Sequence, residues 1–148
     1  MQVKIKKLHE DAKIPSYSKP GDAGLDLTAI DDGIMVHESA TGVESYIEYS
    51  TGLAIEIPEG YVGLIYPRSS ITVKALMLKN GVGVVDSSYR GPIKLRFARF
   101  SSVPENLYHK EDRIGQLIIQ QIPFIELVEV KELEVSERNE GGFGSSGK

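Results

Sequence analysis

The segment YIEYSTGLAIEIPEGYVGLIY, residues 46–66, decides the fold class. Residues 46–57 alternate between apolar and polar side chains and are rich in β-branched and aromatic residues, which is typical of a half-buried strand. PEG at 58–60 is a turn sequence, and 61–66 then runs back. The segment therefore predicts antiparallel strands joined by a tight turn.

The same strand-like pattern recurs on both sides of this segment. Further strands are predicted at the N-terminal MQVKIKKLHE, 78–85, 92–100 and 113–130. Pro123 divides the last of these into two strands, because proline cannot donate a ladder hydrogen bond.

A short helical turn is predicted within 69–78, with Ser69 or Ser70 as its cap, and the β-branched residues there keep it short. The sequence has no internal repeat and no linker segment. We therefore expect one all-β domain, a sandwich or barrel, with one short helix.

Composition narrows the functions open to this chain. Of 148 residues, 41% are hydrophobic and 26% charged, which is typical of a soluble globular domain. The net charge of −4 argues against general nucleic-acid binding, although a small anionic ligand needs only a few N–H groups and an arginine. No apolar run is long enough to cross a membrane, and no targeting segment is seen, so we expect the cytoplasm. The absence of cysteine excludes disulfides, thiolate nucleophiles and Cys-ligated zinc.

Two of five short polar segments lie in the first half of the chain. In GDAGLDLTA, 21–29, Asp26 stands between two leucines, so its side chain faces either solvent or a metal ion and its waters. In YPRSS, 66–70, Arg68 precedes Ser69 and Ser70. This group is either a helix cap beside a surface arginine or a compact cradle for phosphate.

Two more segments follow. NGVGVVDSSYRG, 80–91, has glycines inside an apolar strand, which allow a ligand to approach the backbone closely. Asp86 at its bend either forms an Asx turn or acts on a ligand, and Tyr89 is either a packed ring or a ligand contact. In EDRIGQLIIQ, 111–120, Gln116 interrupts an apolar run, as a surface residue or a donor to an anion.

The fifth segment is the C-terminal SERNEGGFGSSGK, 136–148. Gly/Ser-rich ends usually behave as flexible coil. The alternative is an arm that folds over an anion through Arg138, backbone N–H groups and serine hydroxyls, while Phe143 stacks on a flat ligand.

Taken in order, AGLDL, PRSS, NGVGVVDSSYRG, RIGQLI and ERNEGGFGSSG resemble the five motifs of the trimeric dUTP pyrophosphatases, or dUTPases. They span residues 23–147. The resemblance implies a distorted β-barrel or jelly roll, and hydrolysis of dUTP to dUMP and pyrophosphate with Mg²⁺. That reaction keeps uracil out of DNA and supplies dUMP for dTMP synthesis. The resemblance also implies a homotrimer with active sites between subunits, no nucleic-acid or membrane partner, a barrel over 1–135 and an arm over 136–148 that closes a site.

The resemblance also assigns roles to single residues. Asp86 would activate the water that attacks the α-phosphorus, and Asp26 would hold Mg²⁺ through water. Tyr89 would pack beneath the deoxyribose and exclude a 2′-hydroxyl. The other expected substrate contacts are Arg68, Ser69, Ser70 and Gln116 at the phosphates, Asn80, Gly83, Val84 and Val85 at uracil, Lys94 beside them, and Arg138, Phe143, Gly144, Ser145 and Ser146 on the arm.

The chain departs from the family pattern in the arm, which reads Arg138–Asn139–Glu140 where Arg–Gly is more usual. It also departs at Gly115, where alanine is common, and at Gly81–Val82–Gly83, which has slightly more glycine than usual. Two alternatives stay open. A dCTP deaminase would need a glutamate in PIKLRFARF, 92–100, which has none. A regulator that binds a nucleotide or a protein could use the stretches 31–45 or 101–112, which otherwise read as surface loops.

Overall fold

The computed structural model describes residues 1–36, 45–100, 106–137 and 139–140. The strands are β1 (Lys4–Lys7), β2 (Leu25–Thr28), β3 (Ile34–Val36), β4 (Tyr46–Ser50), β5 (Leu53–Glu56), β6 (Tyr61–Tyr66), β7 (Leu76–Leu78), β8 (Gly83–Val85), β9 (Lys94–Arg99) and β10 (Arg113–Gln121), and a 3₁₀ helix, η1 (Ser69–Val73), lies between β6 and β7. The all-β prediction with one short helix is confirmed. No helix among the described residues is long and apolar enough to cross a membrane.

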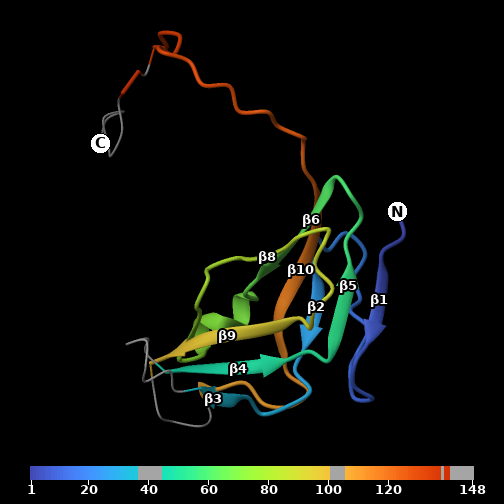
Figure 1. Ribbon diagram of the computed structural model, residues 1–148. Helices are drawn as coiled ribbons and strands as arrows, with labels where there is room; N and C mark the ends of the chain where they lie inside the picture. Colours follow the sequence, from blue (N-terminus) through green and yellow to red (C-terminus); the bar gives the residue numbers. More distant parts are fainter. Residues whose placement is uncertain (37–44, 101–105, 138, 141–148) are drawn as a thin grey trace.

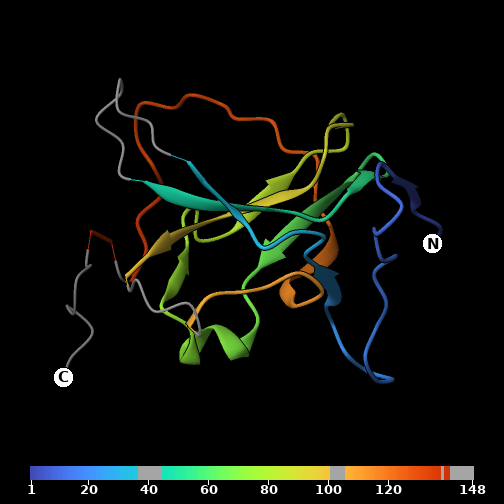
Figure 2. The same cartoon turned by 90° about the horizontal axis from the view of Figure 1, so that it is seen from below.

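The strands form two four-stranded antiparallel sheets and one two-stranded sheet (Figures 1 and 2). One sheet has the order β2-β10-β6-β8, the second has the order β3-β4-β9-β7, and β1 pairs with β5. Apolar side chains from both large sheets form one buried cluster, to which Leu27, Ile65 and Leu117 come from the first sheet and Tyr49 and Phe97 from the second. This is a jelly-roll type of sandwich, and the described strands do not close into a single barrel.

An aromatic group sits deep in this core. The rings of Tyr49, Phe97 and Tyr108 lie 5.6–6.0 Å apart in edge or tilted contacts. Such pairs contribute beyond their buried area because ring edges and faces carry opposite partial charge. The Tyr49 hydroxyl donates to the Tyr108 carbonyl at 3.0 Å, which ties β4 to the segment before β10.

Turns divide two of the predicted strands. The strand expected over 46–57 is interrupted at Gly52, whose φ of 65° is a left-handed conformation that glycine adopts readily. The strand expected over 78–85 is divided into β7 and β8 by a turn in which the Gly81 N–H donates to the Leu78 carbonyl at 3.0 Å. The stretch 31–45, expected as a loop, contains β3.

Two other sequence-based expectations are wrong. β10 ends at Gln121, and no strand follows Pro123 within the described residues up to 137. That segment leaves the body of the molecule (Figure 1), with Phe124 fully exposed and Leu127 90% exposed, so no neighbouring strand supplies hydrogen bonds there. The serine cap of the helical turn is also wrong, because Arg68 occupies the N-cap position and no side chain caps the helix.

Candidate functional site

A row of polar residues crosses the sheet β2-β10-β6. Asp26 on β2 is the register partner of Gln116 on β10, and Gln116 is the partner of Tyr66 at the end of β6. Directly opposed residues of antiparallel strands project their side chains from the same face. The chain then leaves β6 through Pro67 and Arg68, so the arginine enters this row from its open end.

Two arginines hold the Asp26 carboxylate. Arg68 donates from Nε to Oδ1 at 2.7 Å, and Arg113 donates from Nη1 to Oδ2 at 2.9 Å. The Asp26 side chain is 18% exposed, so it is not a freely solvated surface carboxylate. Gln116 donates from Nε2 to the Pro67 carbonyl at 3.0 Å. This bond holds the amide at the end of β6, beside Arg68.

A cavity of about 270 Å³ opens over this row. Its walls include Asp26, Arg68, Ser69 and Gln116, which the sequence predicted together. Gly24 also lines it, and a Cβ atom at that position would collide with Gln116 Oε1. The glycine in AGLDL is therefore required by a close approach between β10 and the chain entering β2.

Sequence reasoning missed Arg113. On plain alternation, Arg113 and Gln116 would face opposite sides of a strand, since they are three residues apart. A register shift between Arg113 and Gly115 restores them to one side, as a β-bulge does. The signal was Gly115, because a glycine inside a strand often marks such a bulge.

A second cavity, of about 500 Å³, lies on the other side of β6 between the β7–β8 turn and β9. Asn80, Gly83 and Lys94 line it, as predicted for one end of the ligand. The volume is in the range of small-molecule sites. The remaining walls are Tyr46, Ile65, Leu78, Lys79, Leu95 and Arg96.

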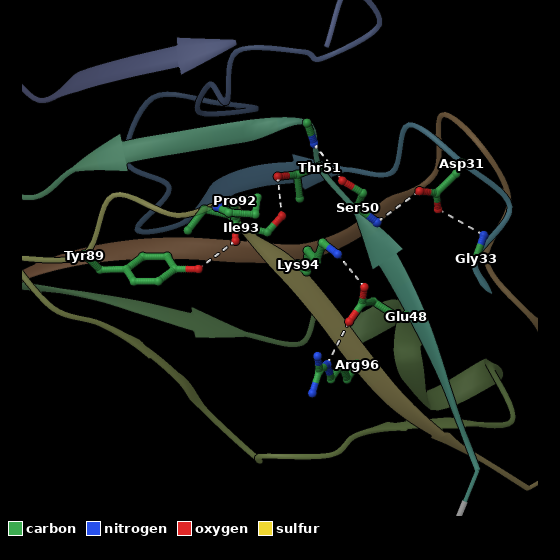
Figure 3. Close-up of polar contacts among 11 residues, drawn as sticks. Asp31, Gly33, Glu48, Ser50, Thr51, Tyr89, Pro92, Ile93, Lys94 and Arg96 are labelled. Carbon is green, nitrogen blue, oxygen red and sulfur yellow. Dashed lines mark hydrogen bonds and ion pairs between the residues drawn. The ribbon is translucent and has the colours of Figure 1, made fainter. Parts of the chain in front are cut away.

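Glu48 on β4 anchors the β9 side of this second cavity (Figure 3). It accepts hydrogen bonds from Lys94 Nζ at 2.6 Å and from Arg96 Nε at 2.8 Å. Burial alone would raise the pKa of Glu48, but the two hydrogen bonds and the two positive charges outweigh it, so its pKa lies below the ordinary value. The Lys94 ammonium is therefore bound to Glu48 in this structure.

The hairpin segment that carries Asp86 is exposed. β8 pairs with β6 and is the last strand in the order of its sheet, so among the described strands its other edge carries unpaired N–H and C=O groups. Gly83 and Val85 are buried, while Val84 is 62% exposed. Asp86 follows at the bend with an exposed side chain, and its carbonyl accepts from the Tyr89 N–H at 3.1 Å.

Tyr89 is held by contacts with the main chain but remains exposed. Its ring contacts Gly91, where a Cβ atom would collide with it, and its hydroxyl donates to the Pro92 carbonyl at 3.1 Å (Figure 3). Tyr89 is nevertheless 43% exposed. This combination fixes the ring without burying it.

The structure thus brings the predicted residues together in two groups. Asp26, Arg68, Ser69 and Gln116 share the first cavity, and Ser70 adjoins them through a 3.5 Å contact with Arg68 Nη1. Asn80, Gly83 and Lys94 share the second, and neither Asp86 nor Tyr89 lines either cavity. The predicted arm residues Arg138, Phe143, Gly144, Ser145 and Ser146 lie outside the described residues.

A family model, sequence relatives and solved structures all relate this chain to the same family. The dUTPase family model matches residues 10–147. Two relatives named deoxyuridine 5′-triphosphate nucleotidohydrolase are similar over nearly their full lengths: one from Hydrogenobaculum sp. (strain Y04AAS1) is 40% identical and covers 99% of both chains, and one from Nautilia profundicola is 42% identical and covers 100% of both. A mutant dUTPase of Staphylococcus bacteriophage 80alpha, solved with dUpNHpp, superposes with a TM-score of 0.80 at 28% identity over 99% of both chains. The chain therefore belongs to the dUTPase family and is a nucleotidohydrolase that acts on dUTP.

Proposed function

We propose that this enzyme cleaves dUTP to dUMP and pyrophosphate by attack of an Asp86-activated water on the α-phosphorus. The observation that supports this most is the paired row of Asp26, Gln116 and Arg68, which makes a charged, hydrogen-bonding cavity of the kind that a triphosphate requires. Asp86 is suited to a general base because it is exposed at a bend beside an unpaired strand edge.

The phosphates would lie over the first cavity. Arg68 uses Nε for Asp26, which fixes the plane of its guanidinium and leaves Nη groups for phosphate oxygens. Ser69 and Ser70 add hydroxyls at the start of η1, and Gln116 adds an amide. Arginine bound at one side to a carboxylate is preorganised, so little conformational entropy is lost when a phosphate arrives.

Asp26 would hold Mg²⁺ through bound water. The described residues contain no cluster of three or more His, Asp or Glu side chains that could hold a metal by themselves. Mg²⁺ usually keeps several waters and binds through one or two carboxylates together with substrate phosphates, so a single carboxylate fits. Both Asp26 oxygens already accept hydrogen bonds from arginines, which favours contact through water. When bound, the ion neutralises phosphate charge.

Uracil would be read by the backbone of β8. The unpaired edge at Gly83, Val84 and Val85 offers N–H and C=O groups of fixed polarity, and Asn80 stands beside it. Cytosine presents a donor where uracil presents an acceptor, so a fixed backbone rejects it. Tyr89, 43% exposed, would pack beneath the sugar. Lys94, held by Glu48, would make its contact from the main chain.

A homotrimer with shared sites would unite the separate groups. On β6, the partner of Val85 is Gly63, three residues before Tyr66, which places the hairpin about 10 Å along the strand from the charged row. Residues 122–135 carry apolar side chains that the described part of this chain leaves exposed, among them Phe124 and Leu127. We propose that this segment packs on a second copy and delivers the arm, 136–148, to a neighbouring site. The enzyme would work in the cytoplasm, keep uracil out of DNA and supply dUMP for dTMP synthesis, without a nucleic-acid or membrane partner.

The reaction is tested by measuring pyrophosphate release from dUTP, dCTP, dTTP and UTP with Mg²⁺, for the wild type and Asp86→Asn. We expect turnover of dUTP alone, and a loss of roughly 10²–10⁴-fold in the variant. Equal turnover of dCTP would reject backbone reading of the base. An Asp86→Asn variant with unchanged turnover would remove Asp86 from the chemistry.

The assembly is tested by sedimentation of two truncations. The wild type should sediment as a trimer, about three times the 16.3 kDa chain, and deletion of 137–148 should leave a trimer of the shortened chain with severely reduced turnover. Deletion of 122–148 should also remove the apolar segment and release monomers. A wild-type mass near that of one chain would contradict the trimer, and unchanged kcat in the shorter truncation would remove the arm from the mechanism.

A further inference from the structure

One buried hydroxyl in the core is not explained by packing. Tyr108 is 2% exposed, and among the described residues no group lies in good hydrogen-bond geometry with its hydroxyl. A buried polar group that is poorly paired lowers stability, and a phenylalanine would fill the same aromatic cluster without that cost. The hydroxyl therefore points to a role other than packing.

The ring of Tyr108 is firmly held beneath the loop that carries η1. The main-chain carbonyl of Tyr108 accepts a hydrogen bond from the Tyr49 hydroxyl at 3.0 Å. Lys74, just after η1, donates from Nζ to the Leu107 carbonyl at 2.7 Å and lies 5.3 Å from the centre of the Tyr108 ring. The Ala75 N–H donates to the Asn106 carbonyl at 3.1 Å. Lys74 and Ala75 thus tie the chain that leaves η1 to 106–108, and the Tyr108 hydroxyl lies near two residues at the start of η1.

Those residues are Ser70 and Arg68, both predicted phosphate contacts. Burial raises the pKa of Tyr108, while the nearby Ser70 hydroxyl and the Arg68 charge act in the opposite direction. The phenol therefore stays protonated at neutral pH and keeps a hydrogen to donate. Ser70 itself is weakly engaged, because its 3.5 Å contact from Arg68 is at the limit of a hydrogen bond.

We propose that Tyr108 is a positioning residue for Ser70 in the substrate complex. The Tyr108 hydroxyl donates to Ser70 Oγ, and Ser70 then donates its own hydrogen to a phosphate oxygen of dUTP. Each oxygen in this chain donates once, and the Tyr108 bond occupies one lone pair of Ser70 Oγ, which limits the directions in which Ser70 can donate its hydrogen. Successive hydrogen bonds also polarise one another, which strengthens the last one. The inference rests on the phosphate role proposed above for Ser70.

The test is Tyr108→Phe, which removes one oxygen and keeps the ring. We expect kcat/KM for dUTP to fall about 3- to 10-fold, as for one neutral hydrogen bond, with an unchanged or higher Tm. The matched control is Tyr49→Phe, in the same cluster, whose hydroxyl has a structural partner in the Tyr108 carbonyl. That variant should lower Tm and leave kcat/KM within about twofold of the wild type.

A double-mutant cycle separates positioning from packing. In a Ser70→Ala background, Tyr108→Phe should cause no further loss of kcat/KM, because its effect passes through Ser70. An equal loss with and without Ser70 would overturn the proposal, as would an unchanged kcat/KM in Tyr108→Phe alone. Each variant is compared with a wild-type enzyme that turns over dUTP. A wild type without that activity would instead refute the proposed function.

Discussion

The charged row and the proposed uracil hairpin are built in opposite ways. Asp26 lies on β2 at one edge of its sheet, where β10 fixes its register and Arg68 and Arg113 engage both of its oxygens at 2.7 and 2.9 Å. The hairpin lies at the other edge, on β8, with Val84 62% and Tyr89 43% exposed. The proposed phosphate half is therefore preorganised within one chain, whereas the proposed base half presents an open edge that substrate or another subunit would complete.

This contrast predicts that substitutions in the charged row and in the hairpin affect stability and activity differently. In the charged row, each side chain helps to hold the next, so a substitution should disturb folding and catalysis together. In the hairpin, exposed side chains contribute little to the core, so catalysis should change alone. The four predictions below test this difference, beginning with the largest expected effect.

Asp26→Asn should reduce both turnover and stability. The amide keeps the shape of the carboxylate but removes the charge that Arg68 and Arg113 share. We expect turnover to fall on the order of 10²-fold, because both guanidinium groups lose their fixed orientation. Unfolding in urea should show a loss of about 1–3 kcal/mol, since a partly buried charged pair is broken.

The comparison variant for Asp26→Asn is Asp86→Asn. It should lose turnover without a change in the urea midpoint, because Asp86 is exposed and its side chain makes no hydrogen bond or ion pair that the described residues supply. Equal destabilisation in the two variants would abolish the distinction between the two halves.

Gly24→Ala should reduce turnover by about 5- to 10-fold, roughly what one neutral hydrogen bond supplies. The new methyl group would displace the Gln116 amide and break its bond to the Pro67 carbonyl. The effect on Tm should be small, because the end of a glutamine can move. Pyrophosphate release measures the first effect and thermal unfolding the second.

A Gln116→Ala background provides the control for Gly24→Ala. Without the amide, only a tight 3.0 Å contact with the Cβ of residue 116 remains, so the double variant should be little worse than Gln116→Ala alone. A further loss in the double variant would mean that Gly24 acts on the site by another route.

The strands could be predicted from the sequence, whereas the contacts between them could not. Alternation in 92–100 reports which face of the strand is buried, and β9 agrees. In 46–57 it does not, because Leu53, Ala54 and Ile55 of β5 are all buried. Alternation also says nothing about a strand's neighbours, so the apolar run after Pro123 looked like a strand although no edge among the described strands receives it. The bulge that turns Arg113 toward Asp26 depends on pairing between distant segments, and local sequence carries only the hint of Gly115.

The candidate site was predictable to the same degree. Residue types identified Asp26, Arg68 and Gln116, because polar side chains within apolar strands need a reason. Tyr108 escaped notice because a tyrosine in a predicted polar loop reads as a surface ring, and its burial with Tyr49 and Phe97 is a tertiary result.

Glu48→Gln should flatten the acid limb of the stability profile. The folded-state pKa of Glu48 lies below its ordinary 4.5, so its ion pairs with Lys94 and Arg96 stabilise the protein above that pH. This contribution is lost as pH falls through the lowered pKa. We expect wild-type Tm to fall more steeply than that of the variant below about pH 4.5.

Glu56→Gln is the matched control for this effect. Glu56 also has a lowered pKa, from its hydrogen bond and ion pair with Lys4, but the Lys4 side chain is 82% exposed and water screens the pair. Its profile should stay close to that of the wild type. If the two variants behaved alike, Glu48 would not be the anchor of the second cavity.

Val84→Thr should have the smallest effect, although Val84 lies in the centre of the proposed uracil edge. Threonine keeps the β-branched shape, and the side chain is 62% exposed, so stability should stay within about 0.5 kcal/mol. If main-chain groups read the base, KM for dUTP should also stay within about twofold. Gly83→Ala is the contrasting change, because its Cβ would lie 3.1 Å from Ile65 Cβ and 3.4 Å from Asn80 Nδ2 and would intrude on the second cavity. Its KM should rise while Tm changes little. A larger rise in KM for Val84→Thr than for Gly83→Ala would mean that a side chain, and not the open edge of β8, recognises uracil.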